Sequence, residues 1–173
     1  LQAELLARIG DRDGAIESLR KAIDGSPESR RIQLELGVAL IAQGRQEEGL
    51  AELRAALDAN PALARALVMN GADAIRAGNY DLAELLLEQA VARQPDSVLG
   101  HYNLGLALAA MERFDDAVAE WERAVALAPD HVDSYHNLAL AHLASKEYAA
   151  AWNAVEKIRA LNQEPDPKIG RAH

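Results

Sequence analysis

Apolar residues recur three and four positions apart along nearly the whole chain, in blocks separated by short polar turns. The pattern is clearest over 98–131, where two such blocks flank Glu112 and Arg113. This spacing places the apolar side chains on one face of an α-helix. The stretch therefore predicts a helix–turn–helix unit, with helices over 98–111 and about 114–127. No segment shows the alternation of a β-strand, so we predict no strands.

The same unit recurs before and after this stretch with a fixed period of 34 residues. The series that share this period are the prolines Pro27, Pro61, Pro95 and Pro129; the glycines Gly37, Gly71 and Gly105; the small residues Ala15, Gly49, Ala83, Ala117 and Ala151; the alanines Ala22, Ala56, Ala90 and Ala124; and the large residues Leu19, Leu53, Leu87, Trp121 and Val155. A period of this length indicates stacked helical units, none of which buries its apolar face alone.

Each series has a physical reason. Glycine inside a helix costs about 1 kcal/mol relative to alanine, so its return at 37, 71 and 105 predicts points where two helix backbones approach closely. The small residues from Ala15 to Ala151 are the expected facing contacts, and the large residues fill the space beside them. The prolines cannot continue a helix interior, and we expect them to end each second helix before the next unit.

The remaining helices follow from the same register. They are predicted over 1–9 and 12–24, 30–42 and 46–59, 64–77 and 80–93, and 132–145 and 148–161. Gly10, Gly44 and Gly78 follow three of the first helices, where a left-handed residue ends a helix. Because the chain begins inside a first helix, we interpret it as a segment of a longer protein.

One group of residues carries a resemblance to a known family. The group consists of Tyr102, Asn103, Leu104, Gly105, Phe114, Ala117, Trp121, Ala124 and Pro129, and it resembles the signature of the tetratricopeptide repeat (TPR). The resemblance covers residues 1–162, as a partial repeat over 1–29 and repeats over 30–63, 64–97, 98–131 and 132–162, with 163–173 as a C-terminal tail or cap. It implies an all-α fold, a right-handed superhelical solenoid of about four and a half stacked antiparallel helix pairs. Four positions depart from the pattern, namely Gln46, Asn70, Ile158 and Gln163.

Composition excludes several functional classes. The net charge of −9 and the pI of about 5.0 argue against a nucleic-acid binder, which usually presents a basic face. Without cysteine the chain has neither a disulfide nor a thiol nucleophile. No apolar run approaches the ~18 residues of a membrane-spanning helix, so we expect no direct membrane insertion. None of these features distinguishes one cellular compartment from another.

The sequence contains no constellation typical of an active site. His131, His136 and His142 lie five and six residues apart, which does not align them on one helix face. His101 and His142 occupy positions where the TPR pattern usually has an aromatic residue, so we interpret them as structural. There is no phosphate-binding glycine loop and no nucleophile elbow. We therefore expect no catalysis, no metal and no cofactor.

The TPR resemblance implies that the first helices line a concave groove. A helical projection selects the side chains expected to face it: Arg31, Leu34, Val38, Arg65, Val68, Met69, Ala72, Ile75, Arg76, Leu99, Tyr102, Asn103, Leu106, His136, Asn137 and Leu140. Arg31 and Arg65 repeat at 34 residues, as do Asn103 and Asn137. Asparagine offers both donors and an acceptor to a peptide backbone. We expect a protein or peptide ligand that is acidic at one end and apolar along its length.

Interpretations of these residues that involve no ligand stay open. The asparagines can instead form hydrogen bonds within their own helices, and the arginines can be solvated surface. The most direct reading of the chain is a non-catalytic protein–protein interaction scaffold that binds a peptide or helix in its groove. The alternatives are a substrate-recruiting arm of a larger enzyme such as a glycosyltransferase, or a self-assembling module. The tail is either loose or a cap, with Ile169 covering the apolar edge left by Trp152 and Val155.

Overall fold

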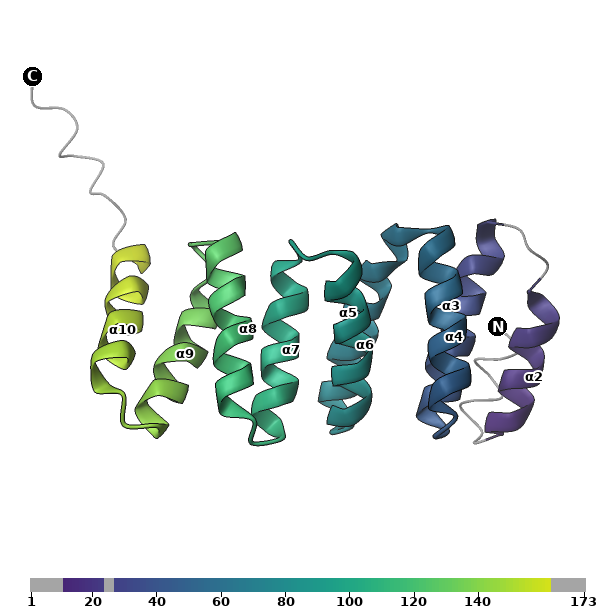
Figure 1. The fold of residues 1–173 in the computed structure, drawn as a ribbon, viewed down its shortest axis with the longest axis horizontal. Coiled ribbons are helices and arrows are strands. Elements are labelled where there is room, and N and C mark those ends of the chain that lie inside the picture. Colours follow the sequence, from purple (N-terminus) through teal and green to yellow (C-terminus); the bar gives the residue numbers. More distant parts are fainter. Residues whose placement is uncertain (1–10, 24–26, 163–173) are drawn as a thin grey trace, which may run out of the picture. The chain divides into compact units, whose positions relative to one another are not determined.

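The computed structural model describes residues 11–23 and 27–162, and every regular element within these ranges is helical (Figure 1). The elements are α2 (Arg12–Ala22), α3 (Pro27–Ala42), α4 (Gln46–Ala59), the short 3₁₀ helix η1 (Pro61–Leu63), α5 (Ala64–Arg76), α6 (Tyr80–Arg93), α7 (Val98–Ala110), α8 (Phe114–Leu127), α9 (Val132–Ala144) and α10 (Tyr148–Asn162).

The helix bounds follow the predicted register closely. Helices α4, α6 and α8 begin and end at the predicted residues. The largest difference is at α3, which begins at Pro27, three residues before the predicted start. Proline is tolerated in the first turn because its missing N–H has no helical partner there. The predicted helix over 1–9, Gly10 and the tail 163–173 lie outside the described residues.

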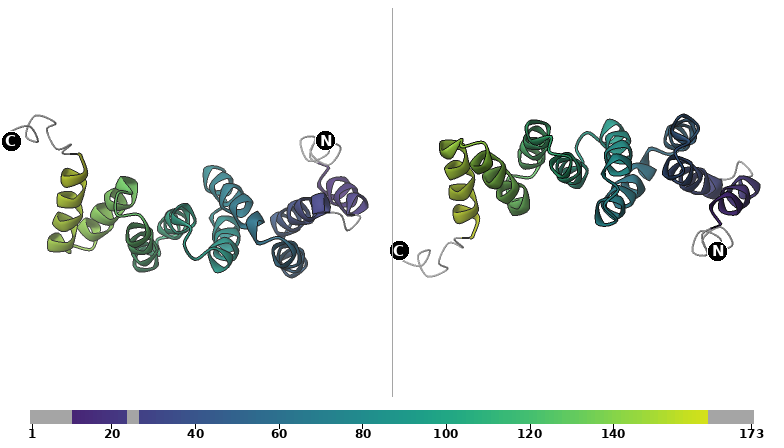
Figure 2. Two further views of the ribbon diagram at one scale, coloured as in Figure 1. Left: turned by 90° about the horizontal axis from the view of Figure 1, so that it is seen from above. Right: turned by 90° about the horizontal axis from the view of Figure 1, so that it is seen from below.

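The chain forms two compact units, residues 1–95 and 96–173, which divide at the start of a turn between repeats. In the first unit α3 packs on α4 and α5 packs on α6, while α2 lies against α3. In the second unit α7 packs on α8, α8 on α9, and α9 on α10. The two helices of each pair run antiparallel and side by side (Figures 1 and 2). The prediction of an all-α fold built from stacked antiparallel helix pairs is confirmed.

The predicted close approaches occur at the glycines. A Cβ added to Gly37 would lie 2.8 Å from the carbonyl oxygen of Gly49 and 2.8 Å from the Leu53 side chain. A Cβ on Gly71 would lie 2.5 Å from Cγ of Leu87. Contacts this short are not tolerated, so a side chain at either position would force the paired helices apart. Each of these glycines therefore makes room for a large residue of the second helix, Leu53 or Leu87. Gly37 also lies against a small residue, Gly49.

In the second unit a tryptophan occupies the place of these leucines. The Trp121 indole lies against Gly105, where even a Cβ would overlap it. Its Nε1–H donates a hydrogen bond of 3.2 Å to the backbone carbonyl of Tyr102 in α7. A buried indole needs such an acceptor. Trp121 therefore fills the space beside Gly105 and ties α8 to α7 with one polar contact.

The turn between the two helices of a repeat has one left-handed residue. Gly44 and Gly78 adopt φ of +81° and +74°, as predicted. The equivalent positions in the second unit are Glu112 and Lys146, and both have φ of +62°. A residue with a Cβ pays about 1–2 kcal/mol for this conformation. The turn geometry is therefore kept in the second unit at a local cost that glycine avoids in the first.

Replacing Gly105 by leucine should lower the free energy of unfolding by about 3 kcal/mol, because the new side chain must displace Trp121. Chemical denaturation followed by circular dichroism measures this. The matched control is Ala119→Leu on the exposed surface of α8. Equal midpoints for the two variants would show that close approach at Gly105 is not required.

Replacing Glu112 or Lys146 by glycine should raise the free energy of unfolding by about 0.5–1 kcal/mol, since the relief of left-handed strain exceeds the entropic cost of glycine. Gly78→Ala is the reverse substitution and should lower it by a similar amount. Thermal melts of the three variants against the parent chain test this. A loss of stability in both glycine variants would contradict the strain argument.

Candidate functional site

The residues of the first helices fall into four columns, each defined by a 34-residue spacing. The first column contains Arg31, Arg65, Leu99 and Asp133; the second contains Glu35, Met69, Asn103 and Asn137; the third contains Val38, Ala72, Leu106 and Leu140; the fourth contains Leu34, Val68, Tyr102 and His136. All of the predicted groove residues on α3, α7 and α9 belong to these columns, as do those on α5 except Ile75 and Arg76.

The first three columns face solvent at least in part. Met69, Leu99 and Leu140 are 69%, 58% and 65% exposed, which is high for large apolar side chains. Arg31 and Arg65 are exposed, as is Arg76 at the end of α5, while Val38, Ala72, Ile75 and Leu106 are partly buried. These columns therefore present accessible side chains that a ligand could contact.

The fourth column points into the packing at Leu34, Val68 and, in part, Tyr102, whereas its last member, His136, is exposed. Leu34 and Val68 are only 1% and 8% exposed, so they belong to the core and their side chains are not accessible to a ligand. Tyr102 is partly buried and its ring meets that of His131 edge-on at 5.0 Å, next to the start of α9. The Tyr102 side chain therefore faces the following repeat, which favours a large ring at this position.

With Leu34 and Val68 removed, the remaining predicted residues define the first-helix face. In unit 1 it consists of Arg31, Val38, Arg65, Met69, Ala72, Ile75 and Arg76, and in unit 2 of Leu99, Tyr102, Asn103, Leu106, His136, Asn137 and Leu140.

The arginines of this face differ in their partners. Arg31 Nε lies 3.4 Å from Oε1 of Glu35 one turn along α3, and Arg76 pairs with Asp73 in the same way on α5. Arg65 has no carboxylate partner among the described residues. Exposed pairs such as these contribute little to stability, but they offset the positive charge. Arg65 is therefore the least compensated cation of the predicted set.

The two asparagines also differ. Nδ2 of Asn103 donates a 2.7 Å hydrogen bond to the carbonyl oxygen of Leu99 in its own helix. Nδ2 of Asn137 is buried and makes no hydrogen bond within the part of the chain that the structure describes. Buried donors are nearly always paired. The local interpretation thus holds for the Asn103 amide nitrogen, whereas Asn137 has an unused donor.

Tyr102 lies beside this unused donor. Its pKa is raised above the ordinary tyrosine value, first because burial disfavours the phenolate and second because of the nearby Asp133 carboxylate. A hydrogen-bonding interaction with the Asn137 side chain lowers the Tyr102 pKa, so the two side chains lie within reach of one another, although the geometry at Asn137 Nδ2 does not meet that of a full hydrogen bond. Tyr102 therefore keeps its hydroxyl proton at neutral pH and can donate as well as accept a hydrogen bond.

Three histidines make structural contacts, whereas His136 is exposed. His101 is buried, and its Nδ1 lies 2.6 Å from Oε2 of Glu120 in α8. Nδ1 of His142 lies 2.6 Å from Oε2 of Glu147. His131 precedes α9, and its Nδ1 accepts from the backbone N–H of Ser134 at 3.3 Å. Across the described ranges no three His, Asp or Glu side chains gather as a metal site.

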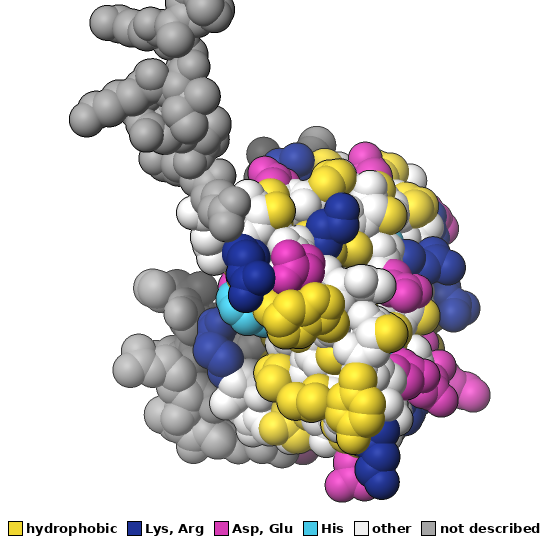
Figure 3. Space-filling model, turned by 90° about the vertical axis from the view of Figure 1, so that its left-hand side faces the viewer, with side chains coloured by type: hydrophobic (Ala, Val, Ile, Leu, Met, Phe, Trp, Pro, Cys, Tyr) yellow, Lys and Arg dark blue, Asp and Glu magenta, His cyan; other side chains and the backbone are white. Residues whose placement is uncertain are grey.

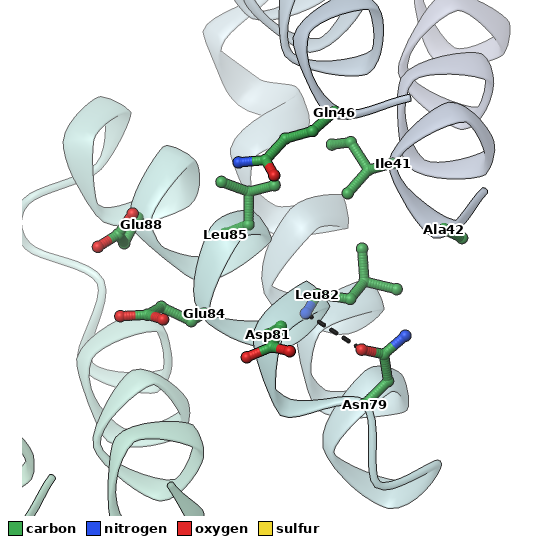
Figure 4. A pocket seen from close by; sticks show the side chains of 9 residues that line it. All are labelled: Ile41, Ala42, Gln46, Asn79, Asp81, Leu82, Glu84, Leu85 and Glu88. Atoms are coloured by element: carbon green, nitrogen blue, oxygen red, sulfur yellow. Dashed lines mark hydrogen bonds between the residues drawn. The ribbon is translucent and has the colours of Figure 1, made fainter. Parts of the chain in front are cut away.

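Unit 1 has a hollow of about 420 Å³ on the side of the second helices (Figure 4). Its lining consists of Ile41, Ala42, Gln46, Asn79, Asp81, Leu82, Glu84, Leu85 and Glu88. Figure 4 shows the side chains of Ile41 and Leu82 near one another, with the α6 carboxylates to one side of them. The Asn79 side chain is occupied locally, because its Oδ1 accepts from Leu82 N at 3.3 Å. The sequence analysis did not anticipate this hollow, since it arises between neighbouring repeats.

Unit 2 has a hollow of about 550 Å³ on α9 and α10. Its lining consists of His136, Ala139, Leu140, Leu143, Tyr148, Ala151, Trp152, Val155 and Ile158. Sequence analysis identified Trp152 and Val155 as an apolar edge but missed the neighbouring Leu143 and Tyr148. Comparison with the preceding repeat could have found Leu143, because Ala109 becomes Leu143 one period later, but not Tyr148, which follows Phe114 in the same register.

Within the described ranges, none of the helices combines the length and the apolar character needed to cross a bilayer.

The raised pKa of Tyr102 predicts a pH effect on stability. The unfolded chain releases this proton at the ordinary tyrosine pKa of about 10, whereas the folded protein releases it only at higher pH. The free energy of unfolding should therefore fall as pH rises from the ordinary pKa to the raised one. In Tyr102→Phe the free energy of unfolding should decrease less with pH. Urea titrations from about pH 9 to about pH 11, the range in which tyrosine titrates, measure this. Tyr148→Phe, which removes an exposed phenol, is the control, and identical slopes would contradict the prediction.

Comparisons with known proteins agree with this architecture. A tetratricopeptide-repeat family model matches residues 1–64 and 68–111, and a second one matches 98–131. No curated protein matches the sequence. Among solved structures, a point mutant of MamA has 24% identity and a TM-score of 0.65, covering 78% of this chain and 98% of its own. A crystal structure of MamA has 20% identity and a TM-score of 0.61, covering 98% of this chain and 97% of its own.

MamA from Desulfovibrio magneticus RS-1 has 23% identity and a TM-score of 0.60, covering 95% of this chain and 93% of its own. At these identities the similarity to MamA shows the fold alone. The family models, by contrast, match most of the sequence, repeat by repeat. The chain therefore belongs to the tetratricopeptide-repeat family.

Proposed function

We propose that this chain is a non-catalytic interaction module that binds a peptide or a helix along its first-helix face. Membership of the tetratricopeptide-repeat family supports the general part of this proposal, because such arrays serve protein–protein interaction. The observation that carries the specific part is the exposure of Met69, Leu99 and Leu140 on first helices. Large apolar side chains that are exposed beside polar neighbours, as in each unit here, suit an interaction surface.

The polar groups of the face suggest what the ligand offers. In unit 1 the uncompensated Arg65 favours a carboxylate near the apolar Met69. In unit 2 Tyr102 and the unused donor of Asn137 favour a carbonyl acceptor, once side-chain adjustment exposes the buried amide. A peptide backbone supplies such carbonyls whatever its sequence. Unit 1 thus favours an apolar peptide with at least one acidic residue, and unit 2 favours a peptide backbone.

Selection from a displayed library of random peptides provides a ligand for testing. Peptides retained by the parent chain are synthesised with a fluorescent label, and their affinities are measured by polarisation. Arg65→Ala should weaken binding and flatten its dependence on salt, because a screened charge attraction is lost. Asn137→Ala should weaken binding about fivefold with an unchanged salt slope, since a neutral hydrogen bond contributes about 1 kcal/mol.

Arg54→Ala is the matched control, because Arg54 is an exposed arginine on the second helix α4. It should leave affinity and salt slope close to those of the parent chain. If substitution of Arg54 or Glu88 lowers the affinity for the selected peptides while neither first-helix variant does, the binding surface lies on the second helices and the proposal is refuted.

A further inference from the structure

The end of unit 2 carries an exposed apolar surface that the first-helix face does not account for. We call it the end face and define it by Leu140, Leu143, Tyr148, Trp152, Val155 and Ile158. Tyr148 and Trp152 are 64% and 58% exposed, and Leu143 is 54% exposed. Figure 3 looks onto this end and shows hydrophobic side chains gathered at its centre, with charged ones around them. The side chains surround the 550 Å³ hollow.

The 34-residue register shows that this surface is not a polar terminus. A terminal repeat that faces water is expected to replace apolar contact residues with polar ones. Here the opposite occurs, because Ala109, Val118 and Ala124 of the preceding repeat become Leu143, Trp152 and Ile158. Ala124 is fully buried in its own repeat. The larger side chains also differ from what a further repeat of the same kind packs against, so the surface fits a different occupant.

The charge of this surface distinguishes it from the rest of the chain. The whole chain carries a net charge of −9. The α9–α10 pair over 132–162 is balanced, with Asp133, Glu147 and Glu156 against Lys146, Lys157 and Arg159. Arg159 pairs with Glu156 at 2.9 Å and lies 5.8 Å from the Trp152 ring centroid. Two copies of an acidic chain repel one another in general. At the α9–α10 pair the charges balance, so contact between two copies there adds no net charge repulsion.

We propose that the end face is the contact surface of a homodimer, in which α10 packs against α10 of a second copy. In such a two-fold contact the same residues meet from both sides, so Trp152 and Tyr148 form the centre. The contact is closed and yields a dimer rather than a chain of molecules. It uses residues of α10 that the proposed peptide surface does not use, although Leu140 belongs to both.

The size of the surface sets the expected strength. Helices of 13 and 15 residues are about 20 Å long and together about 20 Å wide, roughly 400 Å² in projection. Specific interfaces bury about 800 Å² on each partner. The end face is therefore smaller than a standard interface, so the dimer should be weak and should dissociate on dilution.

The eleven residues 163–173 are the competing occupant from the same chain. They contain one large apolar residue, Ile169, together with Pro165 and Pro167. One isoleucine offers little apolar surface against a tryptophan, a tyrosine and two leucines. A second end face supplies an equal set of large side chains, which is why we assign the surface to a second copy.

Sedimentation velocity of the full chain from ~1 to ~100 µM tests the proposal. The mass should rise from 18.7 kDa toward twice that value. Trp152→Glu should abolish the increase, and Leu127→Glu, which changes an exposed leucine of α8, should leave it intact. Arg159→Glu changes the exposed arginine beside Trp152 at the rim of the end face; it should weaken the dimer at low salt, and the dimer should recover partly at high salt. Circular dichroism confirms that each variant is folded.

The absence of cysteine allows a direct proximity test. Val155→Cys treated with a bifunctional maleimide should give a covalent dimer, whereas Arg123→Cys on α8 should not. A chain that is monomeric at every concentration would overturn the proposal. So would a dimer unaffected by both end-face variants, assemblies larger than a dimer, or dimerisation that appears only after residues 163–173 are deleted. Peptide binding by Trp152→Glu is measured as well. If it is unchanged, the loss of the dimer is independent of the proposed peptide-binding function.

Discussion

The close approach of the two helices within each repeat is the constraint on which the structure depends. At Gly37, Gly71 and Gly105 the first helix has no side chain, and a large residue of the second helix occupies the space. Leu87 and Trp121 serve this role in the second and third of these pairs. Because the same contact recurs every 34 residues, the orientation of each pair is set locally. Which side chains remain on the surface then follows from the position of each residue within its 34-residue repeat.

Register separates residues that pack from residues that remain available for binding. Leu34 and Tyr102 occupy equivalent positions, and both take part in packing, the first in the core and the second against His131. Their neighbours Arg31 and Leu99, also equivalent to one another, are exposed. A shift of three positions along a helix thus decides whether a side chain stabilises the stack or is free to contact a ligand.

Charge explains why an acidic chain can still offer distinct surfaces. Local ion pairs reduce the positive charge of unit 1, as at Arg31 and Glu35, and leave Arg65 as an isolated cation. The α9–α10 pair has no net charge and exposes large apolar side chains such as Trp152. The first-helix face of unit 1 suits an acidic ligand, whereas the end face suits a second copy of the chain. These are different physical requirements, and they are met in different units.

Periodicity within the sequence was sufficient to predict the helices, the left-handed turn at Gly44 and the close approach at Gly105, because each of these is set by contacts inside one repeat. Most of the first-helix residues that it selected are at least partly exposed. Tertiary structure alone decided that Leu34 is core and that Asn137 has an unused donor, since burial and pairing depend on neighbouring elements. It likewise revealed the apolar end face, because a linear pattern records which residues are large but not which of them remain uncovered.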